Sequence, residues 1–315
     1  MTTDHRRAAA FTRYAWGVLA VNLGVILWGA FVRASGSGAG CGSHWPLCNG
    51  SIVPRDPGEA TIIEFVHRLG SGLALVLVAG LWVWALRRFP RGAAARRWAW
   101  AALGLILLEA VVGAGLVLMG WVGEDASGAR AASIAAHLAI TYALVASLTF
   151  VAWYGSPEPR RGAAPAISWV ITVALSLGMV LLGMSGAVTA LGDTLFPPGS
   201  LAEGLVQDLS PGVHFLVRLR VFHPLLALAV AGGGVVWADA RRREVTSIPA
   251  RWRLTLLRGS LLVQVAAGAA NVLLSAPVWL QLAHLLLAEL VWILLIVCLA
   301  EGQARPEPEA PVLAA

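Results

Sequence analysis

Three ionisable side chains lie close together in a stretch that is otherwise apolar enough to cross a membrane. Glu64, His67 and Arg68 belong to the segment IIEFVHRLGSGL at residues 62–73. Spacings of three and four residues place all three on one face of a helix. Ionisable groups are costly inside a bilayer and therefore indicate a function. Together they offer a base, a metal ligand and a cation, although Glu64 pairing with Arg68 while His67 bonds a backbone carbonyl is the simpler alternative.

The composition indicates a polytopic helical membrane protein. Of 315 residues, 58% are hydrophobic and only 13% are charged, and apolar runs of about twenty residues recur along the chain. This pattern excludes a soluble multidomain protein. The formal charge of +6 comes from 23 basic residues, all arginine, and arginines in loops account for it without a nucleic-acid partner. The predicted spans are residues 15–33, 61–86, 98–119, 131–153, 165–190, 214–238, 254–273 and 278–300.

The arginines also predict the orientation of the spans. Most lie in the N-terminal segment and in the connections after the second, fourth and sixth spans. The positive-inside rule places these segments in the cytoplasm. We therefore expect a multi-pass protein of the plasma membrane with both termini in the cytoplasm. The second, fourth, sixth and eighth spans then enter the membrane from its outer side.

Each of these four spans carries a histidine about six to nine residues from its outer end, which corresponds to a depth on the order of 9–14 Å. The four residues are His67, His137, His223 and His284. A lone membrane histidine is more often a packing residue, but four at one depth on alternate helices predict paired axial ligands of haem. His214 competes with His223, but nine residues along a helix turn the two side chains to opposite faces. We expect His214 to be an interfacial residue.

An internal repeat relates the two halves of the chain. EFVHR (64–68) resembles RVFHP (220–224), and LLEAVVGAG (107–115) resembles LVQVAAGAA (262–270). Chance convergence of helices rich in Leu, Ala and Gly is the alternative. We predict an all-α polytopic membrane protein whose eight transmembrane helices form two pseudo-symmetric four-helix bundles. The predicted parts are a cytoplasmic arm (1–14), an N-terminal bundle (15–153), a cytoplasmic linker (154–164), a C-terminal bundle (165–300) and a disordered cytoplasmic tail (301–315).

The repeat predicts two haem sites that differ in the residues next to their histidines. The first site would hold His67 and His137, and the second His223 and His284. Glu64 aligns with Arg220, and Glu109 aligns with Gln264. A carboxylate near a reacting carbon suits proton transfer or the stabilisation of positive charge, whereas a cation near a haem suits its propionates or raises its redox potential. The first site is therefore predicted to be reactive and the second to carry electrons. Glu109 and Glu289 are expected to serve packing, with a proton path as the alternative.

The first external loop, RASGSGAGCGSHWPLCNGSIVP, contains two cysteines. Cys41 and Cys48 lie outside the cytoplasm in the predicted topology, where disulfides persist, and their spacing allows one to form. A metal site that adds His44 is the alternative, although it lacks a fourth ligand at a known spacing. Cys298 is expected to be a small buried hydrophobic residue.

These motifs resemble the haem A synthase family. The glycine-rich loop that ends in WPLCNG, the EFVHR motif and the single histidines of alternate spans carry the resemblance over about residues 15–300. The resemblance implies that haem O is the substrate, that its C8 methyl group is oxidised to a formyl group to give haem A for terminal oxidases, and that haem b is the cofactor. It also implies the site residues. His67 and His137 would flank the substrate haem, Glu64 would be the catalytic carboxylate, His223 and His284 would ligate haem b, and Cys41 would pair with Cys48.

Two departures from the family pattern affect details of this transfer. His44 stands in the cysteine loop where the family commonly has an acidic residue, and Pro224 follows His223 where the family often has arginine. Haem propionates would then be held by Arg68 in the first site and by Arg220 or Arg218 in the second.

The expected partners are haem O, membrane lipid, a haem O synthase, an unidentified electron donor and a second copy of the chain, without nucleic acid. The alternative function is a membrane di-haem b electron carrier of the quinol-oxidising kind. Such a carrier would use the same four histidines and would need neither Glu64 nor the cysteine loop.

Overall fold

A computed structural model describes residues 3–156 and 168–303 of the chain. Within these ranges the fold consists of ten α-helices and one short 3-10 helix, and it contains no β-strand. Eight helical segments are long and apolar enough to span a membrane, which confirms the predicted all-α polytopic class. The elements are α1 (Thr3–Ala34), η1 (Ser37–Ala39), α2 (Glu59–Arg88), α3 (Ala94–Leu118), α4 (Gly128–Gly155), α5 (Trp169–Leu195), α6 (Leu201–Leu209), α7 (Phe215–Leu219), α8 (Phe222–Glu244), α9 (Ile248–Leu273) and α10 (Val278–Gln303).

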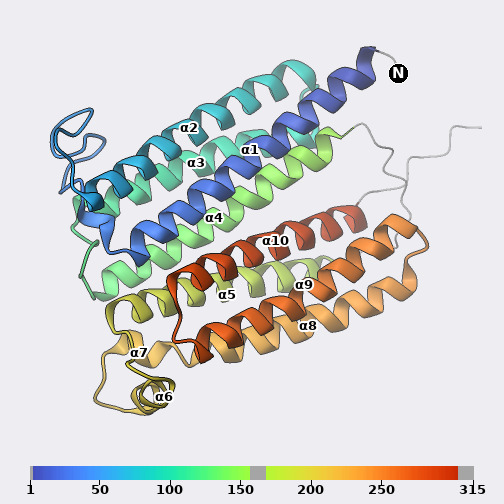
Figure 1. Ribbon diagram of the computed structural model, residues 1–315. Coiled ribbons are helices and arrows are strands. Elements are labelled where there is room, and N and C mark those ends of the chain that lie inside the picture. Colours follow the sequence, from blue (N-terminus) through green and yellow to red (C-terminus); the bar gives the residue numbers. More distant parts are fainter. Residues whose placement is uncertain (1–2, 157–167, 304–315) are drawn as a thin grey trace, which may run out of the picture.

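The long helices form two groups of four (Figure 1). Helices α1 to α4 lie side by side in one group, and α5, α8, α9 and α10 lie in the other. The loop after α1 and the short helices α6 and α7 lie at the same end of the molecule, which we call the loop end, and the N-terminus lies at the opposite end. The grouping agrees with two helical bundles, whereas their pseudo-symmetry, the domain limits and the membrane orientation stay predictions.

Helices α4 and α10 form the seam between the two groups. They are the most buried of the spanning helices, and α4 contacts α1 and α3 on one side and α5 and α10 on the other. Tyr142 and Trp292 meet at this seam, with the indole N–H donating to the Tyr142 carbonyl oxygen at 2.8 Å. The outer helices bury only a narrow stripe and stay apolar elsewhere, as expected for helices that face lipid.

The sixth predicted span is broken near its start. We expected a continuous helix over 214–238, but α7 ends at Leu219, and α8 begins at Phe222 and continues to Glu244. Pro224 explains the place of the break, because proline lacks an N–H and its ring clashes with the preceding turn, so it is accommodated only in the first turn of a helix. The predicted fifth span began at residue 165, and its first residues lie outside the described ranges, while α5 extends to Leu195.

Candidate functional site

The structure brings the four predicted histidines together as two pairs at the loop end. His67 lies on α2, His137 on α4, His223 on α8 and His284 on α10. The rings of His67 and His137 lie close enough to interact electrostatically, and so do those of His223 and His284. This is the pairing that the repeat predicted. Their function as haem ligands stays a prediction.

Three of the histidines pack against a glycine on a neighbouring helix. A Cβ atom at Gly29 of α1 would lie only 2.8 Å from Cε1 of His67, and one at Gly186 of α5 would lie 2.9 Å from Cε1 of His223. His284 packs similarly on Gly268 of α9. The missing side chains leave room for an imidazole between helices. The close packing fixes the position of each of these three imidazoles, which is what a haem ligand requires.

The partners of the remaining ring nitrogens differ between the two groups. Oε2 of Glu109, on α3, lies 2.6 Å from Nδ1 of His137. In the second group, Nε2 of Gln264 lies 3.3 Å from Nε2 of His284 and donates to the His284 carbonyl oxygen at 3.1 Å. The two residues that the repeat aligned therefore both lie against a paired histidine, but the carboxyl group lies at Nδ1 of His137 and the amide lies at Nε2 of His284.

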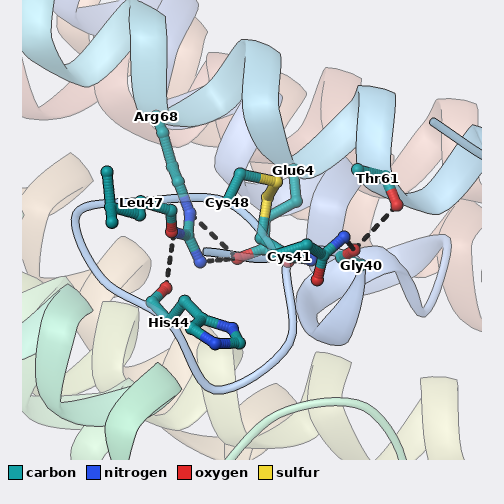
Figure 2. The surroundings of a disulfide bond; sticks show 9 residues. Gly40, Cys41, His44, Leu47, Cys48, Thr61, Glu64 and Arg68 are labelled. Carbon is teal, nitrogen blue, oxygen red and sulfur yellow. Dashed lines mark hydrogen bonds and ion pairs between the residues drawn. A yellow bond between two sulfur atoms is a disulfide. The ribbon is translucent and has the colours of Figure 1, made fainter. Parts of the chain in front are cut away.

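The cysteine loop is closed by a disulfide between Cys41 and Cys48 (Figure 2). Both cysteines are buried. Among the described residues, no group of three or more His, Cys, Asp or Glu side chains is arranged to hold a metal ion, so the alternative metal site with His44 does not form. The expectation for Cys298 is also confirmed, since it is a free and buried cysteine.

Glu64 anchors this loop to α2. The Glu64 side chain is only 5% exposed, and its Oε2 accepts the N–H of Cys41 at 2.8 Å. Its Oε1 pairs with Arg68, which donates in turn to the carbonyl oxygens of His44 at 2.7 Å and Leu47 at 2.6 Å (Figure 2). The ion pair that the sequence offered as an alternative is therefore formed. Neither residue's functional assignment is tested by these contacts.

Arg220 anchors the other half in a similar way. It is buried, pairs with Asp193 at 3.0 Å, and donates to the carbonyl oxygens of Gly192 at 2.7 Å and Phe196 at 2.6 Å. Asp208 of α6 lies 3.7 Å away. Burial raises the pKa of the Asp208 carboxyl group, and the nearby charge of Arg220 opposes that rise. Arg220 therefore connects the ends of α5 and α6 beside the second histidine pair.

His214 begins α7 and is separate from the histidine pairs. Its Nδ1 accepts the N–H of Leu216 at 3.3 Å, and its ring stacks on Phe196 with 4.8 Å between centroids. These contacts give it a local structural role at the helix start.

Arg33, which is half-buried, and Glu289, which is buried, are two residues to which we assigned no site. Arg33 reaches from α1 to the second group, donating to the Ala190 carbonyl oxygen at 2.5 Å and to Oε1 of Gln281 at 3.0 Å. Glu289 is 1% exposed, and within the described part of the chain its carboxyl oxygens have no hydrogen-bond partner. An arginine at the end of an apolar span and a glutamate within one were the available signals.

Known proteins resemble almost the whole chain. A family model described as cytochrome oxidase assembly protein, COX15-CtaA, matches residues 12–296. A "Protoheme IX farnesyltransferase" of Thermus thermophilus is 50% identical over 287 residues, covering 90% of this chain and 47% of its own length. The chain thus spans about half the length of that relative. The "Heme A synthase" of Shouchella clausii is 32% identical over 284 residues, 86% of this chain and 90% of the relative, and that of Alkalihalophilus pseudofirmus is 31% identical over 233 residues, 70% and 73%. The chain therefore belongs to the COX15-CtaA family of cytochrome oxidase assembly proteins.

Proposed function

We propose that the protein is a haem A synthase, an enzyme that oxidises the C8 methyl group of haem O to a formyl group. The observation that carries this proposal is the histidine pair His67 and His137 in the group of helices that also holds the cysteine loop and Glu64. Relatives named Heme A synthase along most of the chain support the same activity.

The two histidine pairs would bind different haems. His67 and His137 bind the substrate haem, and His223 and His284 ligate haem b, which supplies one-electron transfer when bound. Glycines against three of the four rings support this assignment, because they let each imidazole lie between neighbouring helices in a fixed position. Arg68 and Arg220 lie near the respective sites, but both already bond to loop carbonyl oxygens. They are proposed to hold propionates through the donors that remain.

Glu64 would act on the substrate as a fixed charge. Its two oxygens already interact with the N–H of Cys41 and with Arg68, so the carboxylate is held in place before substrate binds. A preorganised negative charge stabilises positive charge that develops on a nearby carbon. The loop and Arg68 therefore position the group that favours oxidation of the methyl carbon.

Haem O would reach the site from a haem O synthase in the same membrane. The Thermus thermophilus relative, named as a farnesyltransferase that acts on protoheme IX, is about twice as long as the matched region. A single chain of that kind would carry the farnesyl-transferring activity beside the region that this protein resembles. We propose the same order of reactions here, with the haem O synthase as a separate chain in contact with this protein. We also propose that a separate electron donor serves the protein and that the protein forms a homo-oligomer.

A membrane di-haem b electron carrier is the second candidate. The engagement of both Glu64 oxygens by Arg68 and the cysteine loop favours it, because such contacts are also what a purely structural carboxylate makes.

Expression in a membrane that contains haem O but lacks haem A separates the two functions. Pigments extracted from the purified protein and separated by chromatography should include haem A if the protein is the synthase. Haem b without any haem A or oxidised haem O intermediate would support the carrier and contradict the synthase.

A further inference from the structure

Glu109 distinguishes one of the four histidines from the others. Its Oε2 lies 2.6 Å from Nδ1 of His137. The approach lacks hydrogen-bond alignment, because Nδ1 of His137 has no hydrogen-bond partner among the described residues. The proposed hydrogen bond requires the imidazole to turn toward the carboxyl group. Resting on the proposed function, we infer that Glu109 is a positioning residue for His137. It accepts a hydrogen bond from the Nδ1–H of His137 and so directs Nε2 toward the substrate iron. This contact makes His137 the strongest electron donor to iron among the four histidine ligands.

Neighbouring groups hold Glu109 for this role. Its second oxygen, Oε1, lies 2.8 Å from Oγ1 of Thr141, which is 6% exposed. Thr141 follows His137 by one helical turn on α4, so the histidine and the hydroxyl group face the same carboxyl group on α3. The side chain of Glu109 is 14% exposed and that of His137 is 34% exposed. An interaction with a charged group gains strength where water is largely excluded.

The other three histidines have neutral partners or none among the described residues. Nδ1 of His223 lies 3.0 Å from the Ser185 hydroxyl oxygen, and His284 faces the amide of Gln264. Nδ1 of His67 has no hydrogen-bond partner in the described ranges. Among the four histidines and within the described residues, His137 alone therefore has an anionic group against its ring. At the position that the repeat aligns with Glu109, a neutral amide lies against the other ring nitrogen, Nε2, of His284.

This difference has a direct chemical consequence for the bound iron. A carboxylate that accepts the second ring proton fixes the tautomer and raises the basicity of a histidine ligand. A more basic ligand stabilises ferric over ferrous iron. The first haem should therefore have a lower potential than an amide partner would give it, and the asymmetry favours electron transfer from the substrate haem to the second haem.

Exchanging the two side chains tests the inference. Haem b, used as a probe, is added to the purified full-length protein, and both haems are followed by redox titration with optical and EPR detection. Glu109→Gln should raise the reduction potential of the first haem by about 59 mV. For a one-electron couple, this shift corresponds to about a tenfold change in the ratio of the affinities for ferric and ferrous haem. The substitution should also weaken haem binding there about 10- to 100-fold. Glu109→Asp should restore most of the potential, and Gln264→Glu should lower that of the second haem.

An unchanged potential and EPR spectrum of the first haem in Glu109→Gln would overturn the inference, even if haem A formation fell. If that variant does not fold, Gln264→Glu decides, and an unchanged second haem would overturn it. Failure of the wild-type protein to bind haem at His67 and His137 would overturn the proposed function as well. Normal wild-type binding with no effect of the exchange would reject only the role of Glu109.

Discussion

The two halves of the protein anchor their loops with opposite charges at one aligned position. In the first half, buried Glu64 accepts a backbone N–H from the cysteine loop. In the second, buried Arg220 donates to the carbonyl oxygens of Gly192 and Phe196, where α5 ends. Each residue lies three positions before a histidine of a pair. The two halves of the repeat therefore keep the structural role of this aligned position while reversing the charge of the side chain near the paired histidine.

The charges of the side chains near the histidines also differ between the two halves. Glu64 and Arg220 are each paired with an opposite charge, Arg68 in the first half and Asp193 in the second. The unbalanced difference is therefore the carboxyl group of Glu109 against the amide of Gln264. Negative groups stabilise oxidised, positively charged species, and a cation disfavours them. The comparison predicts a first site that oxidises its substrate and a second site that accepts electrons.

Removing one histidine at a time should have the largest effect, because each pair is assigned a separate haem. His67→Ala or His137→Ala should abolish haem A formation and leave most haem b bound. His223→Ala or His284→Ala should deplete low-spin haem b. Optical spectra and pigment chromatography of the purified variants measure both quantities. Loss of haem b from the first pair of variants alone would reverse the assignment of the two halves.

Removing the charge of Glu64 should have the next largest effect. Glu64→Gln keeps an oxygen that can accept the N–H of Cys41, but it loses the ion pair with Arg68 and the negative charge near the substrate. A contribution of about 3–4 kcal/mol to the transition state corresponds to a loss of about 100- to 1000-fold in haem A formation. Haem O or an alcohol intermediate should accumulate, as chromatography would detect, while haem b stays bound. Wild-type amounts of haem A would reduce Glu64 to a structural partner of Arg68.

The glycines beside the histidines offer a smaller and more local test. Gly29→Ala places a methyl group 2.8 Å from His67, and Gly186→Ala places one 2.9 Å from His223. Overpacking of this kind costs about 1–3 kcal/mol, so each variant should weaken haem binding at its own site about 5- to 150-fold, measured by haem titration of the purified protein. Gly24→Ala on α1 is the matched control, because nothing lies within 4 Å of its added Cβ. Equal effects of the Gly29 and Gly186 variants on both haems would contradict two separate sites.

The sequence was sufficient to predict features that depend on composition or on strict spacing. The eight spans follow from apolar length. The repeat and the expected depth predicted that His67 pairs with His137, and the two side chains lie close enough to interact electrostatically, while their assignment to a haem stays a prediction. The spacing of Cys41 and Cys48 allowed a disulfide but also left a metal site open, and the family resemblance implied the disulfide that the structure contains.

Features that depend on tertiary contacts could not be predicted in this way. The acceptance of the Cys41 N–H by Glu64 involves a backbone group that no side-chain pattern reveals, and Arg33 finds its partners on helices of the other half. Two local signals were present but were not used. Pro224 marks the start of α8, and Ser200 with Glu203 has the spacing of a capping box at the start of α6, where the Ser200 hydroxyl accepts the Glu203 N–H.

The smallest expected effect separates the two histidines that competed for the sixth span. His214 caps α7 and stacks on Phe196, whereas His223 packs on Gly186 and interacts with His284. Loss of a helix cap costs about 1 kcal/mol, and about 2 °C in melting temperature for a chain of this size. His214→Ala should therefore lower the thermal stability of the purified protein slightly and leave its haem b content and spectrum unchanged. If His214→Ala removed haem b while His223→Ala retained it, the ligand of the second haem would be His214, and the alignment of His67 with His223 would be wrong.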